Sequence, residues 1–306
     1  MFFVNTEMYS IAYLCKNKRS FVKIVISGST GFIGSALVTF FRGEGHEVAT
    51  IGREIFKMPL ADLNAIINGA DALINLAGAP IISRWTKKRR SILYYSRINY
   101  VDRLTESILT VDVPPRVFIS ASAIGIYSES GKHKESKNKF ARNFLARICK
   151  GWEKAALKNE PRCRLILLRT GMVLGRNGGA FAKLLPIFRL GLGGPIGSGD
   201  QGYSWIHIDD AVGAIDYMIR TEGIVGPVNL VSPNPVTNRY FSYRLAKALN
   251  RPAWFRLPAV FLALLYGEGA TVITRGQIVF PEVLIKSGYK FKFGKLDPAL
   301  EDLVRK

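Results

Sequence analysis

The stretch Lys23–Gly34, KIVISGSTGFIG, decides the fold of this chain. Its first residues form a short apolar run rich in β-branched side chains, which is typical of a buried strand. Gly28, Gly31 and Gly34 follow with the spacing G-x-x-G-x-x-G, and Ala36–Val38 continue as a helix. Such a strand, glycine turn and helix N-terminus can hold a dinucleotide pyrophosphate, because the glycines allow close approach and the helix end presents free N–H groups. The alternative is a tight turn without a ligand; we favour the nucleotide site because context and spacing agree.

Further apolar segments alternate with helical ones along the chain. The predicted strands are Glu47–Ile51, Asp71–Gly78, Arg116–Ile119, Arg164–Arg169 and Val228–Val231. The predicted helices are Ala61–Asn68, Arg84–Thr110, Phe140–Lys158, Phe181–Leu190 and Phe241–Asn250. This alternation predicts an α/β fold, a Rossmann-like doubly wound parallel sheet with a small C-terminal substrate lobe.

The length of 306 residues, 48% of them hydrophobic, allows one large domain or a nucleotide domain with a smaller lobe. We expect an NADP-binding Rossmann domain over residues 21–175, and a mixed substrate lobe with a small C-terminal domain over 176–306. Residues 1–20 do not match the strand pattern, and we interpret them as a poorly ordered extension or a start placed too far upstream. A targeting peptide is the less favoured alternative, because the basic residues follow the apolar ones instead of preceding them.

The composition also bears on partners and on cellular location. A net charge of +20 favours anionic partners, yet no aromatic-studded nucleic-acid motif accompanies it, so we interpret the charge as a solvated surface and expect no specific nucleic acid. The three cysteines form no C-x-x-C pair, which suggests neither a disulfide framework nor a zinc site and favours a cytoplasmic protein. The longest apolar run, Ala259–Tyr266, is too short for a membrane span.

The cofactor preference depends on the residues that follow the second strand. An NAD-specific site usually has a carboxylate there for the ribose hydroxyls, whereas this chain has Gly52-Arg53. A guanidinium matches the geometry of a 2′-phosphate, so we predict NADP(H), with NAD(H) the less favoured cofactor. A solvent-exposed loop arginine is the alternative, and the neighbouring Glu54 weighs against the prediction.

Polar groups follow several later strands, where a doubly wound sheet binds its ligand. One strand ends in Asn75-Leu76-Ala77-Gly78, and another continues into Ser120-Ala121-Ser122-Ala123 and Tyr127. Strand-end hydroxyls can polarise a carbonyl or an alcohol, or simply bond to the backbone. The glycine-rich loop Gly191–Gly202 can close on a ligand. His207 is a candidate acid or base, although a buried structural histidine is the commoner case, and we interpret Asp209 and Asp210 as helix-capping residues.

These motifs occur in the order seen in extended short-chain dehydrogenases/reductases. The chain resembles their atypical branch described as "epimerase family protein", which ends in a small domain of unknown function. The resemblance covers roughly residues 22–300. It rests on the glycine triplet, Asn75–Gly78, Ser120–Ala123, Arg169–Gly171, Phe188–Gly199, Trp205–Asp210, Gly226–Asn229, Ser232–Pro235, Gly276-Gln277, Pro281 and Gly288–Phe291.

The resemblance implies a Rossmann sheet, bound NADP(H) and a set of cofactor-lining residues. We predict the cofactor-binding residues to be Gly28, Thr30, Gly31, Phe32, Ile33, Gly34, Gly52, Arg53, Leu76, Ala77, Gly78, Arg97, Ser120, Thr170 and Val173.

The superfamily's catalytic pair, Tyr-x-x-x-Lys, is missing from the expected helix. Cys149 and Glu153 stand at the tyrosine and lysine positions, and the Tyr-x-x-x-Lys at Tyr243–Lys247 lies too late in the chain to serve. Ser122 occupies the superfamily's serine position, and we predict Ser122 and Tyr127 as catalytic residues.

Three functions remain open after this comparison. The first is an NADP(H)-dependent oxidoreductase or epimerase-like enzyme with a rearranged acid/base set, acting on an unidentified carbonyl or sugar-nucleotide substrate. The second is a non-catalytic NADP(H)-binding regulatory protein of the kind labelled cell-division inhibitor. The third is a nucleic-acid or membrane-surface binder that uses the net charge of +20, and the intact cofactor elements favour the first two. We expect a small-molecule ligand and allow for a homodimer.

Overall fold

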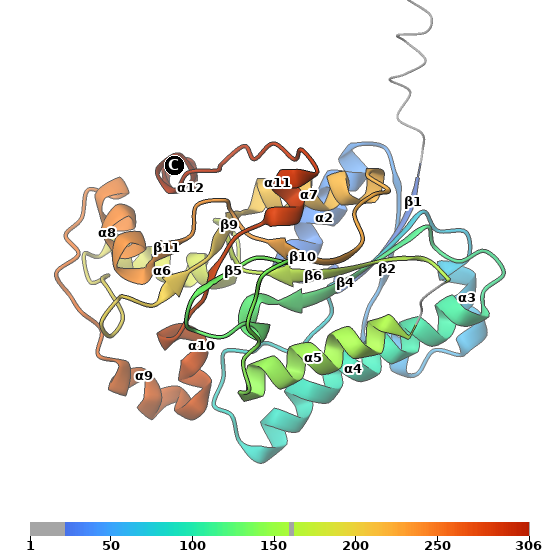
Figure 1. Cartoon of the computed structure of the whole chain (residues 1–306), viewed down its shortest axis with the longest axis horizontal. Helices are drawn as coiled ribbons and strands as arrows, with labels where there is room; N and C mark the ends of the chain where they lie inside the picture. Colours follow the sequence, from blue (N-terminus) through green and yellow to red (C-terminus); the bar gives the residue numbers. More distant parts are fainter. Residues whose placement is uncertain (1–21, 159–161, 306) are drawn as a thin grey trace, which may run out of the picture.

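The computed structural model describes residues 22–158 and 162–305, so the predictions made for residues 1–20 lie outside its described part (Figure 1). Its centre is a six-stranded sheet in the order β10-β6-β4-β3-β1-β2, with every neighbouring pair parallel. The strands are β1 (Lys23–Ser27), β2 (Glu47–Ile51), β3 (Ala72–Asn75), β4 (Val117–Ala123), β6 (Arg164–Thr170) and β10 (Gly226–Leu230). This arrangement confirms the predicted Rossmann-like fold.

Both faces of the sheet are covered by helices, which explains why the central strands β1, β3, β4 and β6 are buried along almost their whole length. Ile24 and Ile26 of β1 pack with α2 (Phe32–Gly43) and α7 (Ile208–Arg220) on one face. Val25 packs on the opposite face, in a cluster with α3 (Leu60–Ile67), α4 (Lys87–Thr110) and α5 (Phe144–Leu157). The neighbouring residues of one strand therefore anchor two separate cores.

The remaining elements form smaller sheets and a helical cluster beside the main sheet (Figure 1). Short pairs join β7 (Met172–Leu174) to β9 (Trp205–His207), β8 (Gly202–Tyr203) to β11 (Val236–Thr237), and β5 (Lys132–His133) to β12 (Ile278–Val279). The helices are α6 (Gly179–Arg189), α8 (Asn238–Ala248), α9 (Ala259–Tyr266), α10 (Thr271–Thr274), α11 (Glu282–Lys286) and α12 (Leu296–Val304), with short 3-10 turns η1 (Arg53–Phe56), η2 (Ile124–Ile126) and η3 (Gly267–Ala270).

A third core joins α6, α8 and α12 around the buried Trp205 and Phe241. The sixth strand of the main sheet, β10, and the helix α7 both come from beyond residue 175. The domain boundary between residues 175 and 176 stays a prediction. The main sheet contains strands from both sides of that boundary. Among the helices of the described residues, none is long and apolar enough to cross a bilayer.

Candidate functional site

The glycine turn after β1 is packed too tightly for any larger side chain. Gly28 has φ +75°, and a Cβ placed on it would lie 2.8 Å from the backbone nitrogen of Ala77. A Cβ on Gly34 would lie 2.2 Å from the carbonyl oxygen of Gly28, and the Gly31 N–H donates to that same oxygen at 3.0 Å. The predicted glycine triplet therefore brings the start of α2 and the end of β3 into close contact with the turn.

The N-terminus of α2 is open toward this turn. Gly31 is its N-cap residue, no side chain caps it, and its first turn contains no acidic residue. Thr30 and Gly31 are exposed, whereas Phe32 and Ile33 are half-buried. Free backbone N–H groups at a helix N-terminus suit an anion such as a pyrophosphate. The turn lies at the point where the chain order in the sheet reverses, between β1 and β3, which is where such sheets bind ligands.

Buried polar side chains mark the carboxyl ends of β1, β3 and β4. Ser27 donates to the Asn75 side-chain oxygen at 2.6 Å, and the Ala77 N–H donates to the same oxygen at 3.2 Å. Within the described residues, the Asn75 Nδ2 and the Ser120 Oγ are buried without a hydrogen-bond partner. Because buried polar atoms are rarely left unpaired, these two atoms fit a site that a ligand or water completes. Leu76 lies above them, bonded through its N–H to the Ser27 carbonyl at 3.0 Å.

The tip of β2 presents one cation and one anion. Arg53 is exposed and opens η1, and Gly52 is held by the Tyr100 hydroxyl, which donates to its carbonyl at 2.8 Å. The Glu54 carboxylate folds back and accepts from the Gly52 N–H at 2.5 Å. The carboxylate of Glu54, which weighs against NADP(H) in the sequence, therefore lies close to Arg53, the residue predicted to bind the 2′-phosphate.

Arg97 supports the loop that follows β3. Its guanidinium donates to the carbonyls of Leu93 at 2.9 Å and Ala79 at 2.8 Å, and it lies 5.2 Å from the centre of the Trp152 ring. A Cβ on Gly78 would lie 3.1 Å from the guanidinium carbon. Burial lowers the pKa of Arg97 below its ordinary value. The Arg97 side chain thus packs against Gly78 and supports the loop that is predicted to line the cofactor.

The loop after β7 meets the start of α2 through one aromatic ring. Cβ atoms on Gly175 and Gly178 would each lie 2.4 Å from the ring of Phe32. Val173 is buried just before this loop, and Thr170 ends β6 half-buried. The ring occupies space that only glycines leave open, so the N-terminus of α2 packs directly against the loop after β7. Sequence reasoning identified Phe32 but missed Gly175 and Gly178, whose only signal is that they are glycines close to the strand end.

The two predicted catalytic hydroxyls belong to one buried polar network. Ser122 donates to the Glu153 carboxylate at 2.7 Å, and Arg169 binds both oxygens of that carboxylate at 2.8 Å. Arg169 also donates to the Tyr127 hydroxyl at 2.8 Å, and Tyr127 in turn donates to the Asn229 side-chain oxygen at 2.8 Å. The network links β4, α5, β6 and β10, so it crosses the sheet beneath its carboxyl edge.

The electrostatics of this network differ from those of a Tyr-x-x-x-Lys pair. Burial raises the pKa of Tyr127, and the nearby Arg169 opposes that rise only in part. Burial alone would lower the pKa of Arg169, but its hydrogen bonds and charge interaction with Glu153 raise it. Burial also raises the pKa of the Cys149 thiol to about 12. Arg169 is therefore a permanent cation whose charge is neutralised by Glu153, and the thiol and phenol stay protonated near neutral pH.

Sequence reasoning missed the pairing of Glu153 with Arg169. In the sequence, Glu153 stands at the superfamily's lysine position, and Arg169 begins the motif Arg169–Gly171. They are 16 positions apart, on a helix and the strand after it, so no local spacing pairs them. The only available signal was a charged residue at the end of an otherwise apolar strand.

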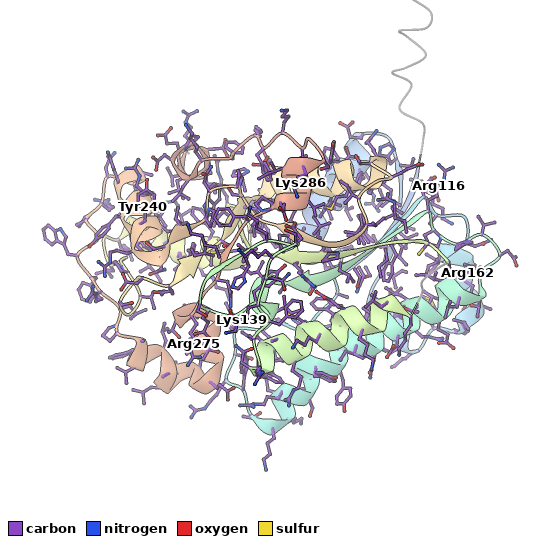
Figure 2. The ribbon with its side chains drawn as sticks, in the orientation of Figure 1. Arg116, Lys139, Arg162, Tyr240, Arg275 and Lys286 are labelled. Carbon is purple, nitrogen blue, oxygen red and sulfur yellow. The ribbon has the colours of Figure 1, made fainter. Side chains whose placement is uncertain are left out.

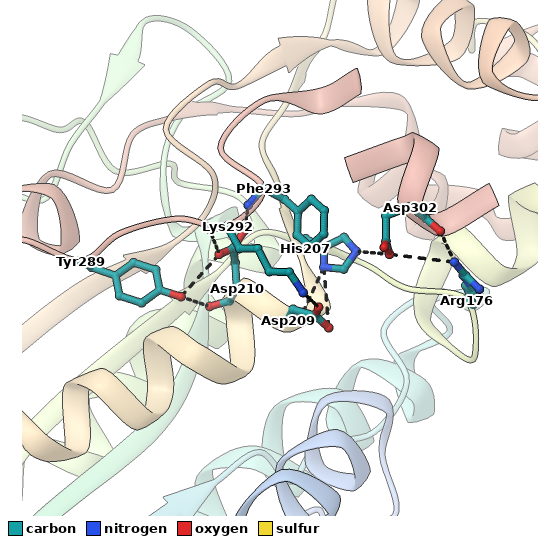
Figure 3. A network of polar contacts seen from close by, with 8 residues as sticks. All are labelled: Arg176, His207, Asp209, Asp210, Tyr289, Lys292, Phe293 and Asp302. Carbon is teal, nitrogen blue, oxygen red and sulfur yellow. Dashed lines mark hydrogen bonds and ion pairs between the residues drawn. The ribbon is translucent and has the colours of Figure 1, made fainter. Parts of the chain in front are cut away.

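A second polar network ties the C-terminal segment to the start of α7 (Figure 3). The His207 Nδ1 accepts from the Asp209 N–H at 3.1 Å, so the histidine caps the helix, and the prediction that the aspartates do so is wrong. The Asp210 carboxylate instead accepts from the N–H groups of Lys292 at 2.7 Å and Phe293 at 2.8 Å. His207 lies 3.3 Å from the Asp302 carboxylate of α12, which supports its predicted structural role.

The chain was compared with protein families and with solved structures. The model described as "NAD dependent epimerase/dehydratase family" matches residues 24–230, and a domain of unknown function, DUF1731, matches residues 257–303. An Arabidopsis thaliana protein, "Epimerase family protein SDR39U1 homolog, chloroplastic", is 35% identical over 95% of this chain and 90% of its own length. Human "Epimerase family protein SDR39U1" is 32% identical over 92% of this chain and 100% of its own. These findings confirm the resemblance to the epimerase family branch.

Solved structures agree with the family comparison. Human SDR39U1 (isoform 2), crystallised with NADPH, superposes with a TM-score of 0.86 at 32% identity, covering 92% of this chain and 98% of the human one. A nucleoside-diphosphate sugar epimerase from Corynebacterium glutamicum gives a TM-score of 0.75 at 26% identity, covering 97% of this chain and 62% of its own. A Bacillus cereus UDP-glucuronic acid 4-epimerase, at 17% identity and a TM-score of 0.74, shares the fold.

Proposed function

Because the chain belongs to the NAD dependent epimerase/dehydratase family, we propose that it binds NADP(H) at the glycine turn and acts as an oxidoreductase or epimerase-like enzyme. The substrate class we propose is a carbonyl compound or a sugar nucleotide. The observation that carries the proposal is the contact between Gly34 and Gly28, where only the absence of side chains lets an uncapped helix face the turn. The NADPH in the human relative's crystal structure supports the choice of cofactor.

The residues around the glycine turn have separate roles in this proposal. The N–H groups of the turn and of the first residues of α2 hold the pyrophosphate, and Arg53 pairs with the 2′-phosphate. Leu76, Ala77 and Gly78, supported by Arg97, form the wall across the switch point. Thr170 and Val173 lie at the end of β6 and on β7, from which they line the nicotinamide side. When bound, the nicotinamide donates or accepts a hydride.

Ser122 is the better placed of the two proposed catalytic residues. The Ser122 side chain is 3% exposed and donates its proton to Glu153, and we propose that its oxygen accepts a hydrogen bond from a substrate hydroxyl. Tyr127 is fully buried, and its hydroxyl is already held between Arg169 and Asn229. For Tyr127 we therefore propose a supporting role, in which it helps to fix the Arg169 guanidinium and through it the Ser122–Glu153 pair.

The test is a titration of the purified protein with NADPH and with NADH, followed by intrinsic fluorescence. We expect NADPH to bind much more tightly, and Arg53→Ala to lose this preference while NADH binding stays unchanged. Equal binding of both nucleotides by the wild type would overturn the assignment of Arg53. No binding of either would mean that the glycine turn is only scaffold.

A regulatory protein that binds NADP(H) without turnover is the second candidate. The observation that favours it is Glu153 at the lysine position, where its charge is neutralised by Arg169 instead of activating a tyrosine. A screen of carbonyl compounds at 340 nm, together with product analysis of sugar nucleotides incubated with the protein and NADP(H), separates the two functions, because an epimerase returns its cofactor to the starting redox state and leaves the absorbance unchanged. Oxidation of NADPH or formation of an epimer that Ser122→Ala abolishes supports the enzyme; tight binding with neither result on any substrate supports the regulator.

A further inference from the structure

An apolar surface lies on the C-terminal part of the chain, around α9. Of the eight residues of α9, only Leu262 is buried, while Val260, Phe261, Leu264 and Leu265 are 60% to 68% exposed. Just before α9, Trp254 is 89% exposed and Phe255 is 64% exposed. We call these six exposed side chains the α9 surface.

Neighbouring loops make this surface continuous. The segment before α9 runs beside the glycine-rich loop, with the Leu257 N–H donating to the Pro195 carbonyl at 3.0 Å and the Gly197 N–H donating to the Leu257 carbonyl at 2.9 Å. On the same loop, Leu190 and Leu192 are 74% and 55% exposed. Exposed apolar patches of this extent mark interaction sites, because single scattered apolar residues are normal but clusters are not.

The surroundings of the α9 surface are basic. Residues 251–275 contain Arg251, Arg256 and Arg275 and a single acid, Glu268; Glu268 is paired with Arg90, and Arg275 is paired with Glu129. Arg251 and Arg256 are exposed on either side of Trp254 and Phe255, and within residues 22–158 and 162–305 neither guanidinium has an ion pair. Arg84 also lies here and donates to the Leu264 carbonyl at 3.3 Å. The apolar side chains are therefore bordered by Arg84, Arg251 and Arg256 on a chain whose net charge is +20.

We propose that the α9 surface docks the protein onto an anionic membrane surface. Exposed Trp, Phe and Leu side chains bordered by arginines match the composition that partitions into the headgroup region. A second copy of the chain is the poorer occupant, because a two-fold interface would bring the arginines of both copies together. At eight residues α9 is too short to cross a bilayer, so it would lie in the interface with Trp254 and Phe261 inserted.

The test uses the single exposed tryptophan of the chain. Trp85, Trp152 and Trp205 are 8%, 7% and 0% exposed, so a change in tryptophan emission on docking reports on Trp254. The full chain is mixed with vesicles of phosphatidylcholine and phosphatidylglycerol, or of phosphatidylcholine alone. We expect a blue shift and co-sedimentation only with the anionic vesicles, and quenching when the lipids are brominated. Trp254→Phe should lose the blue shift but still sediment with the vesicles.

Two pairs of variants separate the apolar and charge contributions. Phe261→Ser with Leu264→Ser should abolish sedimentation, while Val113→Ser with Val225→Ser, at equally exposed sites outside the α9 surface, should not. Arg251→Gln with Arg256→Gln should weaken partitioning roughly thirty-fold, since each basic residue near an anionic surface contributes about a factor of five. Arg116→Gln with Lys286→Gln removes the same charge far from Arg275 and α9, and should have a much smaller effect (Figure 2).

Three results would overturn the proposal. The first is no sedimentation with anionic vesicles, and the second is binding that both arginine pairs reduce equally, which would indicate diffuse attraction by the net charge. The third is a blue-shifted Trp254 emission in the absence of lipid. If dilution reverses that shift, the α9 surface is buried between two copies of the chain. If dilution leaves the shift unchanged, other residues of the same chain cover the α9 surface.

Discussion

The guanidinium of Arg169 and the carboxylate of Glu153 form a two-point ion pair in the interior, with both contacts at 2.8 Å. The two side chains are 5% and 9% exposed. Glu153 stands where the sequence predicts the catalytic lysine of the superfamily, and its pair with Arg169 closes the network between Ser122 and Tyr127. A charge buried at this depth is tolerated only with its partner, so the pair has a measurable consequence for stability.

We expect Glu153→Gln to lower the free energy of unfolding by about 3–5 kcal/mol, because it leaves the Arg169 cation buried without a counter-charge. Urea unfolding followed by circular dichroism measures the change. Glu106→Gln is the matched control: it breaks the exposed pair with Arg103 and should cost about 0–1 kcal/mol.

The double variant Glu153→Met with Arg169→Met tests whether the lost stability comes from the unpaired Arg169 cation. Removing both charges eliminates the desolvation cost, so this variant should be more stable than Glu153→Gln alone. If the single variant proves as stable as wild type, the pair is better hydrated than its burial indicates, and the argument for a fixed Ser122 fails with it.

A graded glycine series examines the turn itself. Gly34→Ala places a Cβ 2.2 Å from the Gly28 carbonyl oxygen and must push α2 away from the turn, so we expect NADPH affinity to fall at least tenfold. Gly31→Ala brings its Cβ to 3.2 Å from the same oxygen and should have a smaller effect. Titration with NADPH gives the affinities.

Gly43→Ala provides the control on the same helix. Nothing lies within 4 Å of its Cβ position, so the substitution should stabilise the protein by about 0.5–1 kcal/mol and leave NADPH affinity unchanged. Equal affinities in all three variants would show that the turn does not contact the cofactor.

These contrasts show what a sequence can and cannot predict here. The strands, the glycine turn and the parallel connections depend on local pattern and on the right-handed connection rule, so a doubly wound parallel sheet could be predicted from Lys23–Gly34 and the segments after it, whereas the strand order comes from the structure. The Glu153–Arg169 pair depends on how α5 packs against β6, which no spacing along the chain reports.

The apolar run at Ala259–Tyr266 shows that an apolar segment of the sequence is not always buried in the structure. A run of eight apolar residues predicts burial, yet most of its side chains are exposed, because only Leu262 reaches the small core with Ile196 and Ala270. Similarly, His207 and Asp210 could be recognised as polar residues at a helix start, but their partners Asp302 and Phe293 are more than 80 residues away.

Glu54 provides a test of cofactor preference that is independent of Arg53. Its carboxylate lies on the Gly52 N–H at 2.5 Å, so its negative charge opposes a 2′-phosphate at the tip of β2. Glu54→Gln should tighten NADPH binding about fivefold by removing repulsion between exposed charges, and leave NADH binding unchanged. Paired titrations at one ionic strength measure both.

Glu47→Gln removes an exposed carboxylate from the opposite end of the same strand and should change neither affinity. An equal gain for NADH would show that Glu54 screens the whole adenosine site instead of the phosphate alone. A loss of NADPH affinity would mean that the carboxylate orders the Gly52 loop for binding.

His207 predicts how stability depends on pH. Burial lowers its pKa below the ordinary value of 6.5, although Asp209, Asp302 and Asp210 all oppose that shift. As pH falls below 6.5 the unfolded chain therefore takes up a proton that the folded chain resists, and stability falls, by at most about 1.4 kcal/mol per pH unit for one group. Above pH 6.5 this contribution to stability is fully present.

His207→Asn isolates this contribution, because asparagine is also a good helix cap and does not titrate. Urea unfolding at pH 7 and pH 5 should show a smaller loss of stability on acidification in the variant than in the wild type. His46 and His133 and the acidic groups are common to both proteins, so their titration largely cancels in the comparison. Equal losses would mean that the pKa of His207 is the same in the folded and unfolded states, and a larger loss in the variant would mean that Asp302 and its neighbours raise that pKa and stabilise the imidazolium in the folded state.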